Sequence, residues 1–198
     1  MHVPEQWGFT LGGSDMTRLS IELIPTNSFG RNLRSLLRGC TWDRLRFHTY
    51  WMKEHRCEVC GDDGEERMRG KHVTVANPAR LECHEKWLYD EKNRIQRLIG
   101  LEALCPLCHQ CKHIGRTLSV GAGERAIRHL ARVNRFTLRQ AEALINEAMI
   151  QHVKRSAGPR WTLDLSWLQN HCALTEQDKL DLPIDDRGIH KGTVATEE

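Results

Sequence analysis

The segment "LCPLCHQCKHIG" (residues 104–115) places five potential metal ligands within nine residues, and the fold depends on how they divide. Its cysteines are Cys105, Cys108 and Cys111, and its histidines are His109 and His113. Two residues between Cys105 and Cys108 allow a tight turn to direct both sulfurs at one ion. A single ion with four ligands cannot use all five side chains, so the segment indicates two different sites.

A second C-x2-C pair, Cys57 and Cys60, lies upstream of the first. Two such turns complete a tetrahedral site of four sulfurs, and thiolates in that geometry select zinc. A redox dithiol needs only one pair in a strand-helix-strand context, which the sequence lacks. The spacing therefore predicts a structural Zn²⁺ held by Cys57, Cys60, Cys105 and Cys108, which fastens the intervening chain as a staple.

The remaining ligands of the segment divide by helical periodicity. His109 and His113 are four residues apart and share one helix face, whereas Cys111 lies on the opposite side and is expected to be a buried thiol. The inserted segment "LECHE" (81–85) can fold back beside this helix. His84, His109 and His113 would then line one pocket, with Glu82 or Glu85 at its edge. Such ligands fit a catalytic divalent ion, for example Mg²⁺, Mn²⁺ or Ni²⁺.

Composition places the chain among cytoplasmic globular proteins. Eight cysteines in 198 residues favour metal ligation over disulfides when the chain has no apolar leader. No stretch approaches the roughly 20 apolar residues of a membrane span, so no membrane partner is expected. No glycine-rich phosphate loop is present, and no small-molecule organic cofactor is predicted.

Charge is unevenly distributed along the chain. Residues 173–198 hold seven acidic and three basic residues, whereas residues 1–172 hold 26 basic and 19 acidic, a net of +7. A basic body indicates a phosphate-bearing partner, and we expect DNA. The candidate contacts are Lys112, Arg116, Arg125, Arg128 and Arg132. For the arginines after residue 123, the alternative is the ordinary solvated face of an amphipathic helix.

Periodicity predicts a mixed α+β fold. The expected helices cover 41–55, part of 85–100, 123–135 and 137–157. Alternation predicts short terminal strands at 18–25 and 161–168, which we expect to pair with each other. The expected organisation has five parts: a flexible arm (1–17), an N-terminal strand and helix flank (18–49), a zinc and metal domain (50–115), a helical flank (116–172) and an acidic, disordered tail (173–198).

The two knuckles and the histidines resemble the HNH nuclease family, which has a ββα-metal fold. The resemblance covers residues 50–115 and is carried by C-x2-C, "LECHE" at the end of a strand, and "LCPLCH" followed by "KH". It implies a zinc-braced ββα-metal core in which a strand histidine is the general base and His109 is a metal ligand. The family's function is metal-dependent hydrolysis of phosphodiester bonds in DNA.

The resemblance leaves two registers open at the strand. If Cys83-His84 matches the family's doublet, His84 is the base and Cys83 an unusual ligand. If His84-Glu85 matches it, His84 is a ligand and Glu85 stands in the place of the base. The family's middle asparagine falls at Gly100, where Asn93 or Gln96 would have to replace it. We therefore expect an HNH endonuclease. The alternative is a degenerate, non-catalytic HNH-like zinc module that binds nucleic acid or a protein partner.

Overall fold

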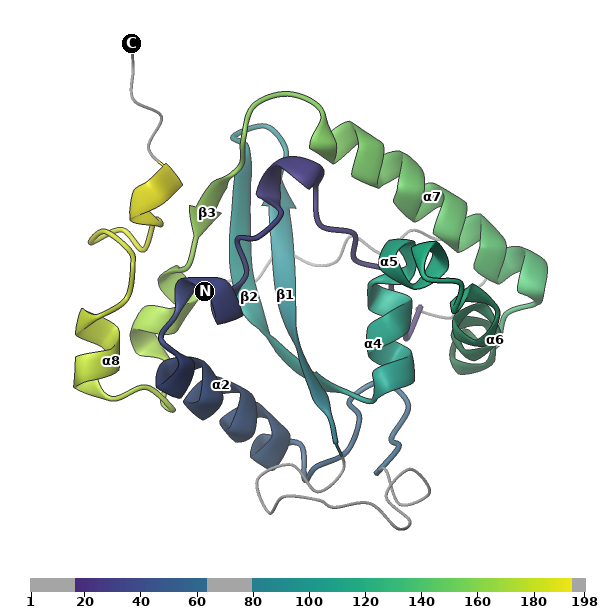
Figure 1. Ribbon diagram of the computed structural model, residues 1–198, viewed down its shortest axis with the longest axis horizontal. Coiled ribbons are helices and arrows are strands. Elements are labelled where there is room, and N and C mark those ends of the chain that lie inside the picture. The colour runs from purple at the N-terminus through teal and green to yellow at the C-terminus, as the bar shows by residue number, and fades with distance from the viewer. Residues whose placement is uncertain (1–16, 64–79, 194–198) are drawn as a thin grey trace, which may run out of the picture.

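The computed structural model describes residues 17–63 and 80–193 (Figure 1). Within these residues the chain combines helices with one three-stranded sheet, so the mixed helix and strand class is confirmed. The strands are β1 (Glu82–Asp90), β2 (Ile95–Leu104) and β3 (Thr162–Asp164). The α-helices are α1 (Leu33–Leu36), α2 (Gly39–Met52), α4 (Pro106–Lys112), α5 (Ile114–Ser119), α6 (Gly123–Asn134), α7 (Leu138–Ser156) and α8 (Glu176–Leu180). Short 3-10 helices are η1 (Thr26–Ser28), η2 (Ser166–Asn170) and η3 (Lys191–Thr193).

The centre of the fold is an antiparallel hairpin of β1 and β2, and this corrects the helix expected within 85–100. Its register runs from Glu82 opposite Leu104 to Asp90 opposite Ile95, with a bulge after Lys86. The turn at 91–94 is closed by Asp90, whose carboxylate accepts from the backbone and side-chain amides of Asn93 at 3.0 and 2.7 Å. This side chain to backbone turn reverses the chain where a continuous helix was expected.

The pairing expected between the chain ends is also wrong. β3 lies parallel to β2, with Ile95 opposite Thr162. Residues 18–25 form no strand, because their backbone groups bond elsewhere. Leu19 N donates to the Asn134 side chain at 2.8 Å, and Glu22 N donates to the carbonyl of Lys112 at 3.0 Å.

Helices cover both faces of the sheet (Figure 1). α2 packs on one face and α4 on the other, with α5, α6 and α7 beyond α4. The helices expected at 41–55, 123–135 and 137–157 are confirmed as α2, α6 and α7. α7 begins with a capping box, in which Thr137 and Gln140 satisfy each other's backbone amides. None of the described helices has the length and apolar character that crossing a bilayer would require.

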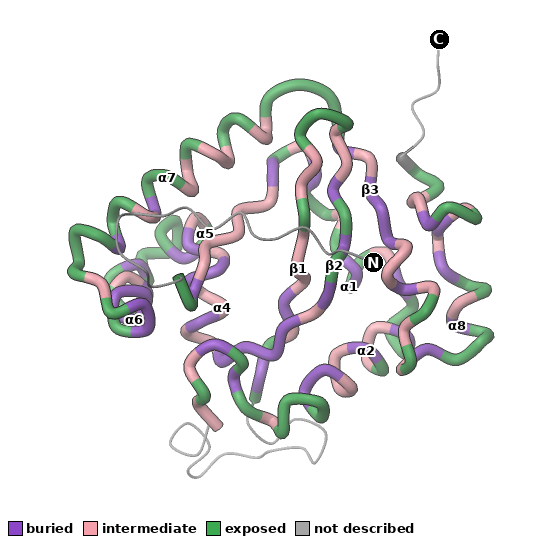
Figure 2. The backbone as a smooth tube through the Cα atoms, turned by 180° about the vertical axis from the view of Figure 1, so that it is seen from behind, coloured by how far each residue is buried: buried purple, intermediate pink, exposed green. Residues whose placement is uncertain are grey.

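Buried residues form two hydrophobic cores, and Figure 2 marks the buried stretches of the backbone in purple. The cysteine-side core lies around α4, α6 and the start of α7. Its members include Cys57, Cys105, Cys108, Leu104, Ile114, Leu130 and Ala141, and the partly buried Cys60 packs against it. The strand-side core lies between α2, β2 and β3, and its members include Leu33, Leu45, Leu98, Leu163 and Leu168. β2 contributes to both cores and so links the two halves of the molecule.

The C-terminal segment from 173 to 193 is folded, which corrects the disordered tail expected there. Leu174, Leu182 and Ile184 are buried in the strand-side core. Asp178 accepts a hydrogen bond from Thr41 in α2 at 2.8 Å. Buried leucines and a paired carboxylate fix the segment, and these contacts outweigh its acidic composition. Residues 1–16, 64–79 and 194–198 lie outside the described residues, and so does all but the last residue of the arm expected at 1–17.

Candidate metal centre

Two C-x2-C turns face each other between the end of α2 and the start of α4. The turn at 57–60 is tied to β2 because Glu58 N donates to the carbonyl of Ala103 at 2.9 Å. Cys105 is the N-cap of α4, and its sulfur accepts from Cys108 N at 3.5 Å. The end of β2 therefore places Cys105 and Cys108 next to Cys57 and Cys60.

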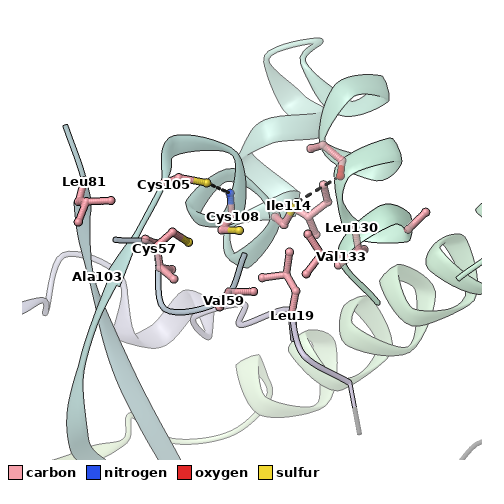
Figure 3. Close-up of a cluster of buried hydrophobic side chains, with 14 of the residues drawn as sticks. Leu19, Cys57, Val59, Leu81, Ala103, Cys105, Cys108, Ile114, Leu130 and Val133 are labelled. Atoms are coloured by element: carbon pink, nitrogen blue, oxygen red, sulfur yellow. Dashed lines mark hydrogen bonds between the residues drawn. The ribbon is translucent and has the colours of Figure 1, made fainter. Parts of the chain in front are cut away.

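The four sulfurs lie within 4.8 Å of one another. The sulfurs of Cys60 and Cys105 are 3.7 Å apart, and a tetrahedral zinc with bonds of about 2.3 Å requires about 3.8 Å between sulfurs. Figure 3 shows the side chains of Cys57, Cys105 and Cys108 turned toward one another. The four predicted cysteines thus lie close enough to bind a metal such as zinc.

The thiols of this cluster perturb one another's ionisation. Hydrogen bonds from Cys105 and Cys108 lower the pKa of Cys57 to about 6, and the same two neighbours lower the pKa of Cys60. Thiolate is the form that binds metal. The contacts with the other sulfurs raise the pKa of Cys108 and, with burial, that of Cys105, so the four thiols become thiolates together only where a cation neutralises them.

A histidine and an arginine of α6 support the cluster from outside. The sulfur of Cys108 lies 3.1 Å from Nε2 of the buried His129. Nδ1 of His129 lies 3.1 Å from a guanidinium nitrogen of Arg132. Because Arg132 can only donate, Nδ1 is the acceptor, and Nε2 carries the proton that it donates to the sulfur. Nothing in the spacing of the sequence indicated this contact.

Three imidazoles meet on the other side of α4. His84 extends from β1, His109 from α4, and His113 from the junction of α4 and α5. The ring centroid of His84 lies 5.6 Å from that of His109 and 4.9 Å from that of His113. The centroids of His109 and His113 are 4.7 Å apart. One ligand atom from each of the three lies within 4.8 Å of the others.

The carboxylates beside this histidine cluster are Glu82 and Glu22. Glu82 contacts Nδ1 of His109, and an oxygen of Glu22 lies 3.1 Å from Nε2 of His84. Burial, followed by the nearby His84 and His109 rings, lowers the pKa of His113 to about 3. His113 is therefore neutral at pH 7, as a metal-binding imidazole must be.

Glu22 belongs to a buried ionic network that sequence reasoning missed. Its carboxylate accepts from the ammonium of Lys112 at 2.6 Å, and Lys112 also lies 3.1 Å from Glu102, without hydrogen-bond alignment. Burial raises the pKa of Glu22, but the bond with His84 and the Lys112 charge outweigh it and lower the pKa to about 2. The only sequence signal was an acidic residue within the apolar run "SIELI".

Glu85 and Cys83 are not brought to the histidines. Side chains alternate along a strand, so both lie on the face opposite to His84. Glu85 accepts from the backbone amide of Leu33 at 2.6 Å, and burial raises its pKa to about 7. Burial also raises the pKa of Cys83 to about 12. "LECHE" opens β1 instead of ending a strand, and of its two glutamates Glu82 is the one that lies at the histidines.

Neither proposed replacement for the middle asparagine reaches the histidine cluster. Asn93 is engaged with Asp90 in the hairpin turn. Gln96 pairs with Tyr89 in the sheet, five residues from His84, or about 17 Å along a strand. Glu22 is the residue that bonds His84.

The predicted DNA contacts differ in exposure. Lys112 is 3% exposed and held by carboxylates, so its prediction as a phosphate contact is wrong. Arg116 lines a cleft with His84, His109 and His113. Arg125, Arg128 and Arg132 are exposed on α6.

The cleft that contains the histidine cluster has a volume of about 1040 Å³. It runs between the segment at 23–34, β1, α2 and α5. Its lining arginines are Arg31, Arg34, Arg46 and Arg116. The site therefore combines imidazoles, a carboxylate and guanidinium groups in one open cavity.

Comparisons with protein-family models, with curated proteins and with solved structures found no match for this chain.

Proposed function

We propose that the chain is a metal-dependent endonuclease of the HNH type, which hydrolyses phosphodiester bonds in DNA. The observation that carries the proposal is the convergence of His84, His109 and His113 from a strand and a helix. The order of the hairpin and α4 supports the ββα resemblance. The cysteine cluster beside α4 supports the expected zinc brace.

The residues of the histidine cluster and Glu82 divide into one general base and a set of ligands for a divalent ion. His109, His113 and Glu82 offer the imidazole and carboxylate groups that would hold a divalent ion such as Mg²⁺, Mn²⁺ or Ni²⁺. Such an ion supplies stabilisation of the negative charge on the phosphate and the leaving oxygen. His84 then remains as the general base.

Glu22 orients this base. Its carboxylate can only accept, so Nε2 of His84 carries the proton of their 3.1 Å bond. The lone pair of His84 is then on Nδ1, and Nδ1 takes the proton from the attacking water. Glu22 stabilises the imidazolium that results, because their opposite charges are in contact and their side chains are only 2% (His84) and 24% (Glu22) exposed.

DNA is the substrate class that suits the rest of the cleft. Arg34 is exposed and Arg46 half-buried on the α2 side, and Arg116 is exposed on the α5 side of the histidines. Guanidinium groups on both sides of a reaction centre suit a polyanion that passes across it. Such contacts make the affinity fall as salt rises.

Plasmid cleavage tests the proposal. We expect metal-dependent nicking by the parent protein, and a loss of about 100-fold or more in His84→Ala and His109→Ala. His190→Ala is the matched control, because His190 N bonds Leu163 in β3, at the other edge of the sheet from β1. Zinc content of each variant verifies that the cysteine cluster is intact.

The same assay distinguishes an endonuclease from the alternative, a non-catalytic module that only binds nucleic acid or a protein partner. DNA binding without cleavage in Mg²⁺, Mn²⁺ and Ni²⁺ alike would show a non-catalytic binding module. Equal cleavage by the parent and both histidine variants would show that a contaminating nuclease is responsible, and the proposal would fail.

A further inference from the structure

A third group of metal-binding side chains lies away from both centres described above. It consists of His48 on α2, together with His171 and Cys172 just after η2. One ligand atom of each lies within 4.8 Å of the other two. The group shares no residue with the cysteine cluster or the histidine cluster.

The distances within this group suit a first coordination shell. Nε2 of His48 lies 3.4 Å from the sulfur of Cys172. A tetrahedral ion with bonds of about 2.1 Å to nitrogen and 2.3 Å to sulfur separates such ligands by about 3.6 Å. The ring centroids of His48 and His171 are 5.3 Å apart and nearly perpendicular, at 81°.

The surroundings leave the ligands accessible. Cys172 is exposed, and both histidines are half-buried. A cavity of about 140 Å³ adjoins His48 and His171 and is also lined by Trp167 and Met52. The cavity is larger than one water molecule requires, so solvent can complete a four-ligand shell.

One existing contact must be exchanged on binding. Nδ1 of His171 accepts a 3.2 Å bond from the backbone amide of Ala173. A neutral imidazole has one lone pair, so coordination by His171 replaces this long hydrogen bond with a metal bond. Cys172 releases its thiol proton to solvent as its sulfur binds the ion.

We propose that His48, His171 and Cys172 form a second zinc site, with solvent as the fourth ligand. Two imidazoles and one thiolate are the ligand types that zinc takes, whereas Mg²⁺ and Ca²⁺ take oxygen. The ligands come from α2 and from the chain beyond β3, so bound zinc fastens the C-terminal segment to α2. The proposal is independent of the nuclease function.

Zinc content per folded chain tests this site. The full chain is equilibrated with a zinc buffer at low micromolar free zinc, desalted and analysed for metal. We expect His171→Ala and Cys172→Ala each to hold about one zinc fewer than the parent. Neither residue lies in a core, so circular dichroism should show the parent fold in both variants.

Cys40→Ala is the matched control, because Cys40 is also an exposed cysteine and lies on the same helix as His48. It should keep the parent zinc content. The zinc lost in Cys172→Ala should also add to any zinc lost in His109→Ala when the two substitutions are combined. This additivity would distinguish the site from the proposed nuclease centre. Unchanged zinc in Cys172→Ala, or the same loss in Cys40→Ala, overturns the proposal.

Discussion

Lys112 shows how one side chain organises the face of the sheet beside α4. Its ammonium is almost fully buried between Glu22 and Glu102, and it also donates to Ser20 at 3.0 Å. A buried ion that loses its partner is costly, because the remaining charge stays in a low-dielectric site. Lys112 therefore fixes Glu22, and through Glu22 it fixes the position of His84.

We expect Lys112→Met to lower the free energy of unfolding by about 3 to 5 kcal/mol, since it leaves Glu22 without its ammonium partner and Glu102 with only the exposed Lys86. Lys86→Met is the matched control: Lys86 reaches the same Glu102 at 3.2 Å, but its side chain is 42% exposed. The control should cost about 0 to 1 kcal/mol. Urea unfolding measures both, and equal losses would contradict the burial argument.

His129 should affect how tightly the cysteine cluster holds zinc. His129→Ala removes the N–H donor to the Cys108 sulfur, and we expect zinc affinity to fall about 10-fold or more. His129→Gln retains an N–H donor and should restore part of the loss. Competition with a zinc chelator measures the effect. Arg128→Ala, on the exposed side of α6, should leave affinity unchanged, and the prediction fails if it matches His129→Ala.

The candidate metal ligands were easier to predict from the sequence than the residues that support them. Each cysteine pair has the two-residue spacing of a zinc-binding turn, and His109 directly follows the second pair. Such short spacings can be read from the sequence. Glu22 and His129 reach their partners across 62 and 21 residues. Such contacts depend on how the elements pack, so only the structure could identify them.

At the scale of elements, the hairpin was mistaken for a helix for a physical reason. Trp87, Leu88, Ile95, Leu98 and Ile99 recur at spacings that also fit a helix face. β1 is an edge strand with half-buried residues on both faces, which weakens the alternation of a one-sided strand. The usable signal was the polar stretch at 90–94, in which Asp90 and Asn93 bond to each other and close the turn.

α8 docks on α2 through Asp178, and this contact should depend on pH. Burial raises the pKa of Asp178, but hydrogen bonds from Thr175 and Thr41 and the charge of Arg44 outweigh it and lower the pKa to about 2. A lowered carboxyl pKa stabilises the fold above the unfolded-state value of 3.8, and this stabilisation is lost as the pH falls through the folded value.

We therefore expect Asp178→Asn to lower the free energy of unfolding by about 1 to 3 kcal/mol at neutral pH. The difference from the parent should persist down to about pH 4 and close toward pH 2, as the parent carboxylate takes up its proton. Zinc loss in acid affects both proteins alike. Asp181→Asn, which removes only an exposed pair with Arg38, should show a much smaller difference. A difference in unfolding free energy that stays constant from neutral pH to pH 2 would contradict the lowered pKa of Asp178.

At the scale of the molecule, the two cores depend on different forces. The cysteine-side core includes three cysteines of the predicted zinc site, and the fourth, Cys60, packs against it. The strand-side core is built from leucines of α2, β2, β3 and the C-terminal segment, together with a few other apolar side chains, and includes none of those cysteines. Structural zinc contributes about 10 to 16 kcal/mol in small domains, comparable to the 5 to 15 kcal/mol stability of a whole domain.

Removal of zinc by a chelator should therefore loosen one half of the molecule before the other. Hydrogen exchange read by mass spectrometry should show α4 and α6 losing amide protection first, because their packing surrounds the sulfurs. β3 should keep its protection, since the leucines around it remain packed and it contributes no ligand to either zinc site. Cys40→Ser, whose sulfur belongs to neither core, should respond to the chelator as the parent does. Uniform loss of protection in both halves would show that β2 couples the cores into one cooperative unit.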